Sequence, residues 1–234
     1  MAHSKRIYNQ FCPFARTLDI LGERWTLLVI RNLLIGPLRY KDLLDALPGI
    51  GTNLLADRLK GLESADIVRR RKLPPPAGST VYELTELGRG LEAPLLDLAR
   101  WGLWTLSQPV EDTQFRPLWG AAGLKIVFQP EAALGVHDTY ELRIDGEAFH
   151  ATVADGDLDV RQGPAERPDV VITTDGDTWQ GMASGALSPV EAIATGKLRL
   201  EGDPAAGLRF SQIFRPPASS APPTASSSAT AVAS

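Results

Sequence analysis

Two leucine-periodic segments of this sequence are separated by only four residues, and this spacing restricts the fold sharply. Residues 48–51 read Pro-Gly-Ile-Gly, and the flanking segments 39–47 and 52–65 each predict a helix. In the second helix three leucines recur at i, i+4 and i+7 and therefore share a core-facing side: Leu55, Leu59 and Leu62. Two amphipathic helices joined by a glycine-containing turn predict a helix-turn-helix.

The opposite face of the second helix is predicted to be solvent-exposed. It carries short polar groups and one cation, at Thr52, Asn53, Ala56, Asp57 and Lys60. Side chains of this kind suit base edges and phosphates when a helix enters the major groove of DNA.

A basic hairpin is predicted to follow the helix-turn-helix. Residues 68–73 and 80–84 read as two strands. Because alternate residues of a strand point to opposite faces, two or three cations of the first strand can reach phosphates beside the groove. The complete set of predicted DNA contacts is Arg39, Lys41, Thr52, Asn53, Ala56, Asp57, Lys60, Arg69, Arg70, Arg71, Lys72 and Thr80.

The charge distribution separates two halves of the chain. Residues 1–107 hold 15 Lys and Arg against 11 Asp and Glu, whereas residues 108–234 hold 9 against 17, within a total net charge of −4. Helix-turn-helix geometry also occurs in proteins that do not bind DNA, and a basic run is often only a solvated face. The positive first half, the tight turn and the basic hairpin together favour double-stranded DNA as the partner.

The domain organisation is predicted from changes in composition. Residues 108–113 interrupt a long apolar-periodic segment where the charge balance changes, which indicates a junction. We therefore predict a DNA-binding and dimerisation domain at 1–107, a ligand-binding domain at 108–215 and a disordered Pro/Ala/Ser tail at 216–234. The N-terminus lacks the apolar run of a secretory signal, and no apolar stretch is long enough to span a bilayer. We expect a cytoplasmic protein with no membrane insertion.

The second half has the pattern of an α+β domain. Strands are predicted at 124–129, 139–145, 147–154 and 169–174, with a hairpin turn at Asp145 and Gly146. Helices are predicted at 177–183, after Ser188, and from Asp203 to Phe214, with a short strand at 198–200. The expected architecture is an antiparallel sheet packed with helices.

Several segments of the first half resemble the HxlR-type winged helix-turn-helix regulators. The motifs are Cys12-Pro13, GERWTLLVIR at 22–31, LPGI at 47–50, LADRLKGLE at 55–63 and YELTELG at 82–88. The resemblance covers about residues 10–105 and implies homodimeric transcription regulators whose second motif helix enters the major groove. It does not transfer an operator sequence.

A further helix is predicted over 85–106, ending with Trp101 and Trp104. Its apolar periodicity favours packing within its own domain, whereas the resemblance implies that terminal helices build the dimer interface. Pro94 lacks a backbone donor and is expected to kink or restart this helix.

Cys12 is the only cysteine of the chain, and it has two interpretations. The commoner role is a small apolar residue that anchors the first helix. The resemblance implies a second role, because some HxlR-type proteins use this cysteine as a redox sensor. A disulfide would then be intersubunit or formed with a small thiol.

The second half resembles the sterol carrier protein type 2 family. The motifs are PDVVIT at 168–173, DTW at 177–179, SG at 184–185, SP at 188–189, TGKLRLEGDP at 195–204 and Phe210. The resemblance covers about 113–215 and implies an apolar tunnel for lipids or other hydrophobic molecules. We predict its lining as Phe128, Phe149, Trp179, Met182, Ala183, Ile193, Phe210, Ile213 and Phe214, although a sealed core would use the same residues.

No catalytic or metal-binding motif is predicted. Asp155, Asp157 and Asp159 match the first positions of a calcium loop, but Val160 replaces the required glycine. The expected protein is a ligand-responsive regulator with no cofactor, no metal and no enzymatic activity. Two alternatives stay open: a regulator whose second domain is only structural, and an enzyme that uses this domain as a substrate pocket.

Overall fold

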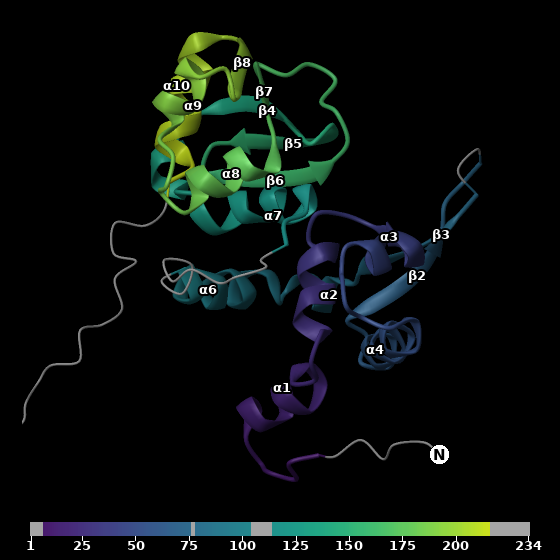
Figure 1. The fold of residues 1–234 in the computed structure, drawn as a ribbon. Helices are drawn as coiled ribbons and strands as arrows, with labels where there is room; N and C mark the ends of the chain where they lie inside the picture. The colour runs from purple at the N-terminus through teal and green to yellow at the C-terminus, as the bar shows by residue number, and fades with distance from the viewer. Residues whose placement is uncertain (1–6, 76–77, 104–113, 216–234) are drawn as a thin grey trace, which may run out of the picture.

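The computed structural model describes residues 7–75, 78–103 and 114–215. The predicted domain junction, Trp104 and the predicted tail lie outside these residues. Two domains are visible, each with its own sheet, and helix α7 lies between them (Figure 1). The fold is α+β.

The first domain is a three-stranded sheet, in the order β1-β3-β2, surrounded by helices. Its elements in chain order are α1 (Pro13–Leu21), α2 (Thr26–Leu33), β1 (Leu38–Arg39), α3 (Tyr40–Asp45), α4 (Thr52–Ser64), β2 (Val68–Lys72), β3 (Thr80–Leu84), α5 (Glu86–Arg89) and α6 (Glu92–Gly102). Helices α3 and α4 form the predicted helix-turn-helix, and the antiparallel pair β2 and β3 forms the predicted hairpin.

The predicted helix over 85–106 is divided into two. Helix α5 ends at Arg89, and α6 restarts at Glu92 with Pro94 as its third residue. A proline is tolerated there because the first amides of a helix have no intrahelical partner. The predicted restart is therefore correct, and it begins two residues before the proline.

The second domain is a five-stranded sheet, in the order β6-β5-β4-β7-β8. Its elements are α7 (Pro117–Val127), the 3-10 helix η2 (Pro130–Ala133), β4 (His137–Ile144), β5 (Glu147–Ala154), β6 (Asp157–Gln162), β7 (Val170–Thr174), α8 (Gly176–Ala183), α9 (Pro189–Ala194), β8 (Leu198–Gly202) and α10 (Pro204–Ile213). The strands pair antiparallel except β4 and β7, which run parallel. The expected antiparallel sheet is thus a mixed one.

Two tight turns shape the β4-β5-β6 meander. The predicted turn at Asp145 and Gly146 is confirmed, with φ of +49° and +82°. A second turn of the same kind, at Asp155 and Gly156, has φ of +50° and +88°. Positive φ at both central residues is typical of the two-residue hairpin turn. Strand β6, which sequence analysis did not assign, begins directly after it.

The predicted strand at 124–129 is wrong, because most of these residues belong to α7. Helix α7 contacts β5 and β6 on one side and α2 and α6 on the other. A helix covered on two sides needs no polar stripe, so its sequence resembles that of a buried strand.

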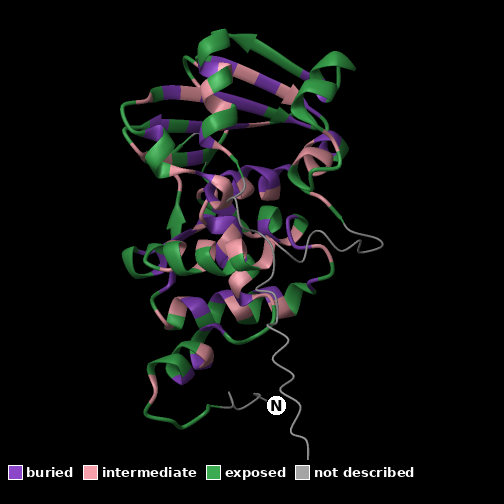
Figure 2. Ribbon diagram, turned by 90° about the vertical axis from the view of Figure 1, so that its left-hand side faces the viewer, coloured by how far each residue is buried: buried purple, intermediate pink, exposed green. Residues whose placement is uncertain are grey.

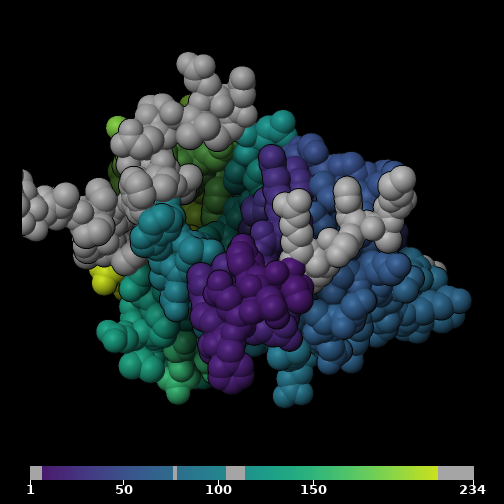
Figure 3. All heavy atoms as spheres, turned by 90° about the horizontal axis from the view of Figure 1, so that it is seen from below, coloured from purple at the N-terminus to yellow at the C-terminus, as the bar shows by residue number. Residues whose placement is uncertain are grey.

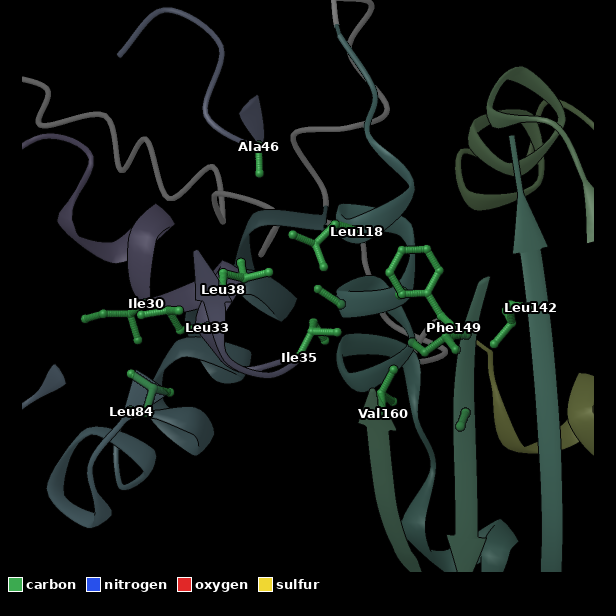
Figure 4. Close-up of a cluster of buried hydrophobic side chains, with 14 of the residues drawn as sticks. Ile30, Leu33, Ile35, Leu38, Ala46, Leu84, Leu118, Leu142, Phe149 and Val160 are labelled. Atoms are coloured by element: carbon green, nitrogen blue, oxygen red, sulfur yellow. The ribbon is translucent and has the colours of Figure 1, made fainter. Parts of the chain in front are cut away.

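The hydrophobic core continues from one domain into the other. Buried and exposed positions alternate along β5, so one face of the sheet is apolar (Figure 2). Leu118 of α7 lies between the buried residues of the first domain, such as Ile35, and Phe149 of the sheet (Figure 4). The two domains therefore share a packed contact through α7.

Candidate DNA-binding surface and ligand pocket

Helix α4 is anchored by its leucines and presents its polar face to solvent. Leu55, Leu59 and Leu62 are almost completely buried. At the start of the helix, the Tyr40 hydroxyl donates a hydrogen bond of 2.6 Å to the Thr52 carbonyl. These contacts fix how α4 is rotated and leave the predicted contact face accessible.

The turn before α4 requires a glycine at position 49. Gly49 has a φ of +92°, and a Cβ there would lie 3.7 Å from the Trp25 ring. An L-residue side chain rarely adopts this backbone conformation. The turn that sets α3 against α4 is therefore specified locally by the sequence.

All of the predicted DNA contacts lie at the surface of the first domain. The exposed set is Arg39, Lys41, Thr52, Asn53, Ala56, Asp57, Lys60, Arg69, Arg70, Arg71, Lys72 and Thr80. The structure brings those of α3 and α4 next to those of the hairpin, since β1 pairs with β3 and α4 contacts β2.

Ion pairs within the domain engage the three hairpin arginines. The side chains of Arg69 and Arg71 each lie 2.8 Å from the Glu83 carboxylate. Burial of Glu83 opposes its ionisation, but hydrogen bonds from Arg71 and Arg69 outweigh this and lower the Glu83 pKa. Arg70 lies 2.6 Å from Glu63 of α4. Sequence analysis missed these pairs, although strand register places Glu83 opposite Arg69.

Four other cations of the predicted interface are better placed to meet phosphates. Within residues 7–75, 78–103 and 114–215, no ion pair involves Arg39, Lys41, Lys60 or Lys72. Of the hairpin cations in the described chain, Lys72 is therefore the one that no carboxylate pairs with.

The predicted pocket residues do not form one enclosed lining. Phe128, Phe149 and Ile213 are buried, whereas Ala183 and Ile193 are exposed. The remaining members are partly buried: Trp179, Met182, Phe210 and Phe214. The set is divided between the inner face of the sheet and the outer surface of the helices.

Aromatic side chains fill the space between β4 and α10. The ring centroids of Tyr140 and Phe210 are 5.0 Å apart, and those of Phe210 and Phe214 are 4.6 Å apart. Phe128 lies 5.8 Å from Phe214. Contacts at these distances are those of a packed core, not those of a hollow one.

A polar network attaches α10 to the sheet beside this cluster. Arg209 donates two hydrogen bonds to Asp138, of 2.6 and 2.8 Å, and the buried Tyr140 hydroxyl donates a third, of 2.7 Å. The hydrogen bond from Arg209 lowers the Asp138 pKa, although burial opposes it. Burial, followed by the bond to Asp138, raises the Tyr140 pKa. Sequence analysis missed this network because 71 residues separate two of its members.

Two open hollows lie beside α8, with volumes of about 270 and 340 Å³. Both are lined by Asp175 and Asp177, and the first also by Asp145. None of the predicted pocket residues lines either of them.

Cys12 lies at the N-cap of α1 and is half-buried. The thiol is therefore neither sealed in a core nor fully exposed.

In the described part of the chain, no group of three or more His, Cys, Asp or Glu residues is arranged to hold a metal ion. Among the same residues, no helix combines the length and hydropathy that crossing a membrane requires.

Comparison with known proteins follows the division into two domains. The model of the HxlR-like helix-turn-helix matches residues 20–109, and that of the SCP-2 sterol transfer family matches residues 129–215. The HTH-type transcriptional regulator YodB of Bacillus subtilis is 38% identical over 94 residues, which cover 40% of this chain and 84% of YodB. The uncharacterized regulator YvaP of the same organism is 34% identical over 94 residues, covering 40% of this chain and 87% of YvaP.

Among solved structures, diamide-treated YodB from B. subtilis aligns with a TM-score of 0.35 and 37% identity, covering 40% of this chain and 93% of that structure. The sequence comparisons span most of the length of YodB and YvaP, and the matched residues include the helix-turn-helix with its exposed α4 face. The chain belongs to the HxlR-like helix-turn-helix transcriptional regulators and carries, after that domain, a sheet-rich domain matched by the SCP-2 sterol transfer family.

Proposed function

We propose that this chain binds double-stranded DNA sequence-specifically as a homodimer in the cytoplasm and thereby regulates transcription. The observation that carries the proposal is the polar face of α4, which is exposed next to the hairpin, where no ion pair involves Lys72 among the described residues. Thr52 and Asn53 lie in the first turn of α4, where backbone amides also favour anions. In this docking α4 enters the major groove and the hairpin follows the adjacent backbone.

The salt dependence of DNA binding tests the role of the hairpin. Replacing Lys72 by alanine should lower the slope of log affinity against log salt by about one, because one counterion fewer is released. Arg70→Ala is the matched control. Arg70 lies two residues from Lys72 on the same face of the strand, but its guanidinium forms an ion pair with Glu63. We expect a smaller change of slope for Arg70→Ala. Equal changes in the two variants would show that the ion pair does not withhold Arg70 from DNA.

The dimer is proposed to form through α1 and the residues before it. Phe11, Phe14 and Ile20 are exposed there, and Phe14 is 71% accessible. Helix α1 extends away from the rest of the first domain as a protrusion (Figure 1), and in the view from below it faces the viewer, in purple, beside the blue helix-turn-helix (Figure 3). Apolar side chains gathered on such a protrusion are typical of a surface covered by a second copy.

Cys12 is proposed as a redox-sensitive thiol at this interface. It is half-buried at the N-cap of α1, beside the exposed Phe11 and Phe14, so an oxidant or a second thiol can reach it. Diamide treatment followed by non-reducing electrophoresis should give a dimer band that is absent in Cys12→Ser. A monomer band alone, from a protein that sediments as a dimer, would assign Cys12 the structural role.

The second domain is proposed to bind a hydrophobic effector. Support comes from the match to the SCP-2 sterol transfer family. Phe210, Ile213 and Phe214 all belong to α10 or its C-cap, so displacement of this one helix would open the space that they fill. The bond between Arg209 and Asp138 opposes that displacement. If α10 is not displaced, no space for an effector opens, and the second domain serves only as a structural part of the regulator.

A further inference from the structure

Helix α7 of the second domain donates a hydrogen bond to the helix-turn-helix. The Trp119 indole Nε1 lies 3.2 Å from the carbonyl oxygen of Ala46. Ala46 is the C-cap residue of α3, the helix that precedes the turn. The last carbonyls of a helix have no intrahelical partner, so a donor from outside completes the end of α3.

Two neighbouring side chains of α2, Arg31 and Asn32, also contact the Trp119 ring and the Ala46 carbonyl. The Arg31 guanidinium lies over the Trp119 ring, 4.8 Å from its centroid. Arg31 also donates two hydrogen bonds, of 3.1 and 3.0 Å, to the Asn32 amide oxygen. The Asn32 amide nitrogen lies 3.5 Å from the Ala46 carbonyl oxygen and is itself buried. Burial lowers the Arg31 pKa to about 10, so the group is still charged at neutral pH.

The other end of α7 is also attached to the first domain. Lys125 pairs with Glu92 of α6 at 2.6 Å, and Arg100 of α6 donates a 3.1 Å hydrogen bond to the Ile126 carbonyl. On its opposite side α7 packs against β5 and β6. A movement of the sheet that shifts α7 is therefore transmitted to the end of α3.

The contact between Trp119 and Ala46 requires the second domain, because Trp119 is part of that domain. Trp119 lies outside residues 20–109, which the HxlR-like model matches. In YodB the matched 94 residues already make up 84% of the protein, which leaves too little chain for a second domain of this size.

We propose that Trp119 is a positioning residue for operator binding. Its hydrogen bond to Ala46 holds the turn that sets α4 against α3, and the state of the second domain reaches the DNA-binding surface through this contact. The inference rests on the proposed DNA-binding function, and it concerns how that surface is held in place.

The test compares two tryptophan-to-phenylalanine variants of the full chain. Trp119→Phe keeps an aromatic ring for Arg31 but removes the indole donor. Trp179→Phe makes the same change at a residue that also packs on α7, against Gly120, and in the described part of the chain no hydrogen bond joins its side chain to the helix-turn-helix. The probe is duplex DNA enriched from a random-sequence pool by the wild-type chain, and amide hydrogen exchange of residues 43–51 is measured in parallel without DNA.

We expect Trp119→Phe to weaken binding of the enriched DNA about threefold to tenfold, which is the range of one net hydrogen bond. Exchange in the 43–51 segment should become faster, because the end of α3 loses its donor. Neither measurement contains an effector, and the phenyl ring of Trp179→Phe still packs against α7 and keeps that helix in place. Trp179→Phe should therefore change neither quantity, even if both variants lower the unfolding midpoint.

Unchanged affinity and unchanged exchange in Trp119→Phe would overturn the inference, as would equal effects in the two variants. If the wild-type chain enriches no DNA sequence, the proposed function fails, and the exchange measurement still decides whether Trp119 holds the turn.

Discussion

Replacing Ala56 by glutamate should abolish specific DNA binding while the protein stays folded. Ala56 is exposed in the middle of α4, and glutamate is a good helix former, so the free energy of unfolding should change by less than about 0.5 kcal/mol. In the proposed complex the new carboxylate meets the DNA. A juxtaposition of like charges costs about 3 kcal/mol, which weakens binding more than about a hundredfold. Fluorescence anisotropy with labelled duplex DNA measures this loss.

The matched control is Ala205→Glu, which makes the same change of charge near the start of α10 in the second domain. Ala205 is also exposed. We expect its affinity for DNA to stay within about twofold of the wild type, because the position lies outside the proposed interface. A comparable loss in both variants would mean that net charge, and not the α4 face, determines binding.

Phe149→Ala is expected to destabilise the second domain by about 3 to 5 kcal/mol. Phe149 is 0% exposed, between Leu142 on the neighbouring strand and Leu118 of α7. In a packed core its removal leaves a cavity that neighbouring side chains fill only in part. Chemical denaturation followed by circular dichroism gives the change in midpoint and slope.

Leu208→Ala provides the control in the same domain. Leu208 is 62% exposed on α10, so its truncation should change the free energy of unfolding by less than about 0.5 kcal/mol. A loss below about 1 kcal/mol for Phe149→Ala would contradict the packed core, because a side chain that lines an existing cavity has fewer contacts to lose. That result would favour a preformed pocket for the hydrophobic effector.

The helix-turn-helix was predictable because its information is local. Leucine spacing identified the buried side of α4, and the glycine of the turn adopts the positive φ that a glycine permits. Residues on the opposite side of α4 are accordingly exposed. The same holds for the turn at Asp145 and the Ser188 cap, whose hydroxyl accepts a hydrogen bond from the Glu191 amide.

Features that depend on long-range packing were not predictable in the same way. The residues of α7 were assigned in part to a strand, because a helix buried between two domains has no polar face. The sequence predicts four equivalent hairpin cations, but Glu83 and Glu63 pair with the three arginines, and Lys72 is the one that has no ion pair among the described residues. The predicted pocket lining combined buried and exposed residues, since composition alone does not distinguish a core from a cavity.

Selection of bound sequences from a random duplex pool tests the central claim most directly. The full chain should enrich one motif made of two inverted half-sites, about one helical turn or a multiple of it apart, because a two-fold dimer presents two α4 helices. The same selection with Ala56→Glu should enrich no motif, whereas Ala205→Glu should recover the wild-type motif. Failure of the wild-type chain to enrich any sequence, or the same motif from Ala56→Glu, would contradict the account.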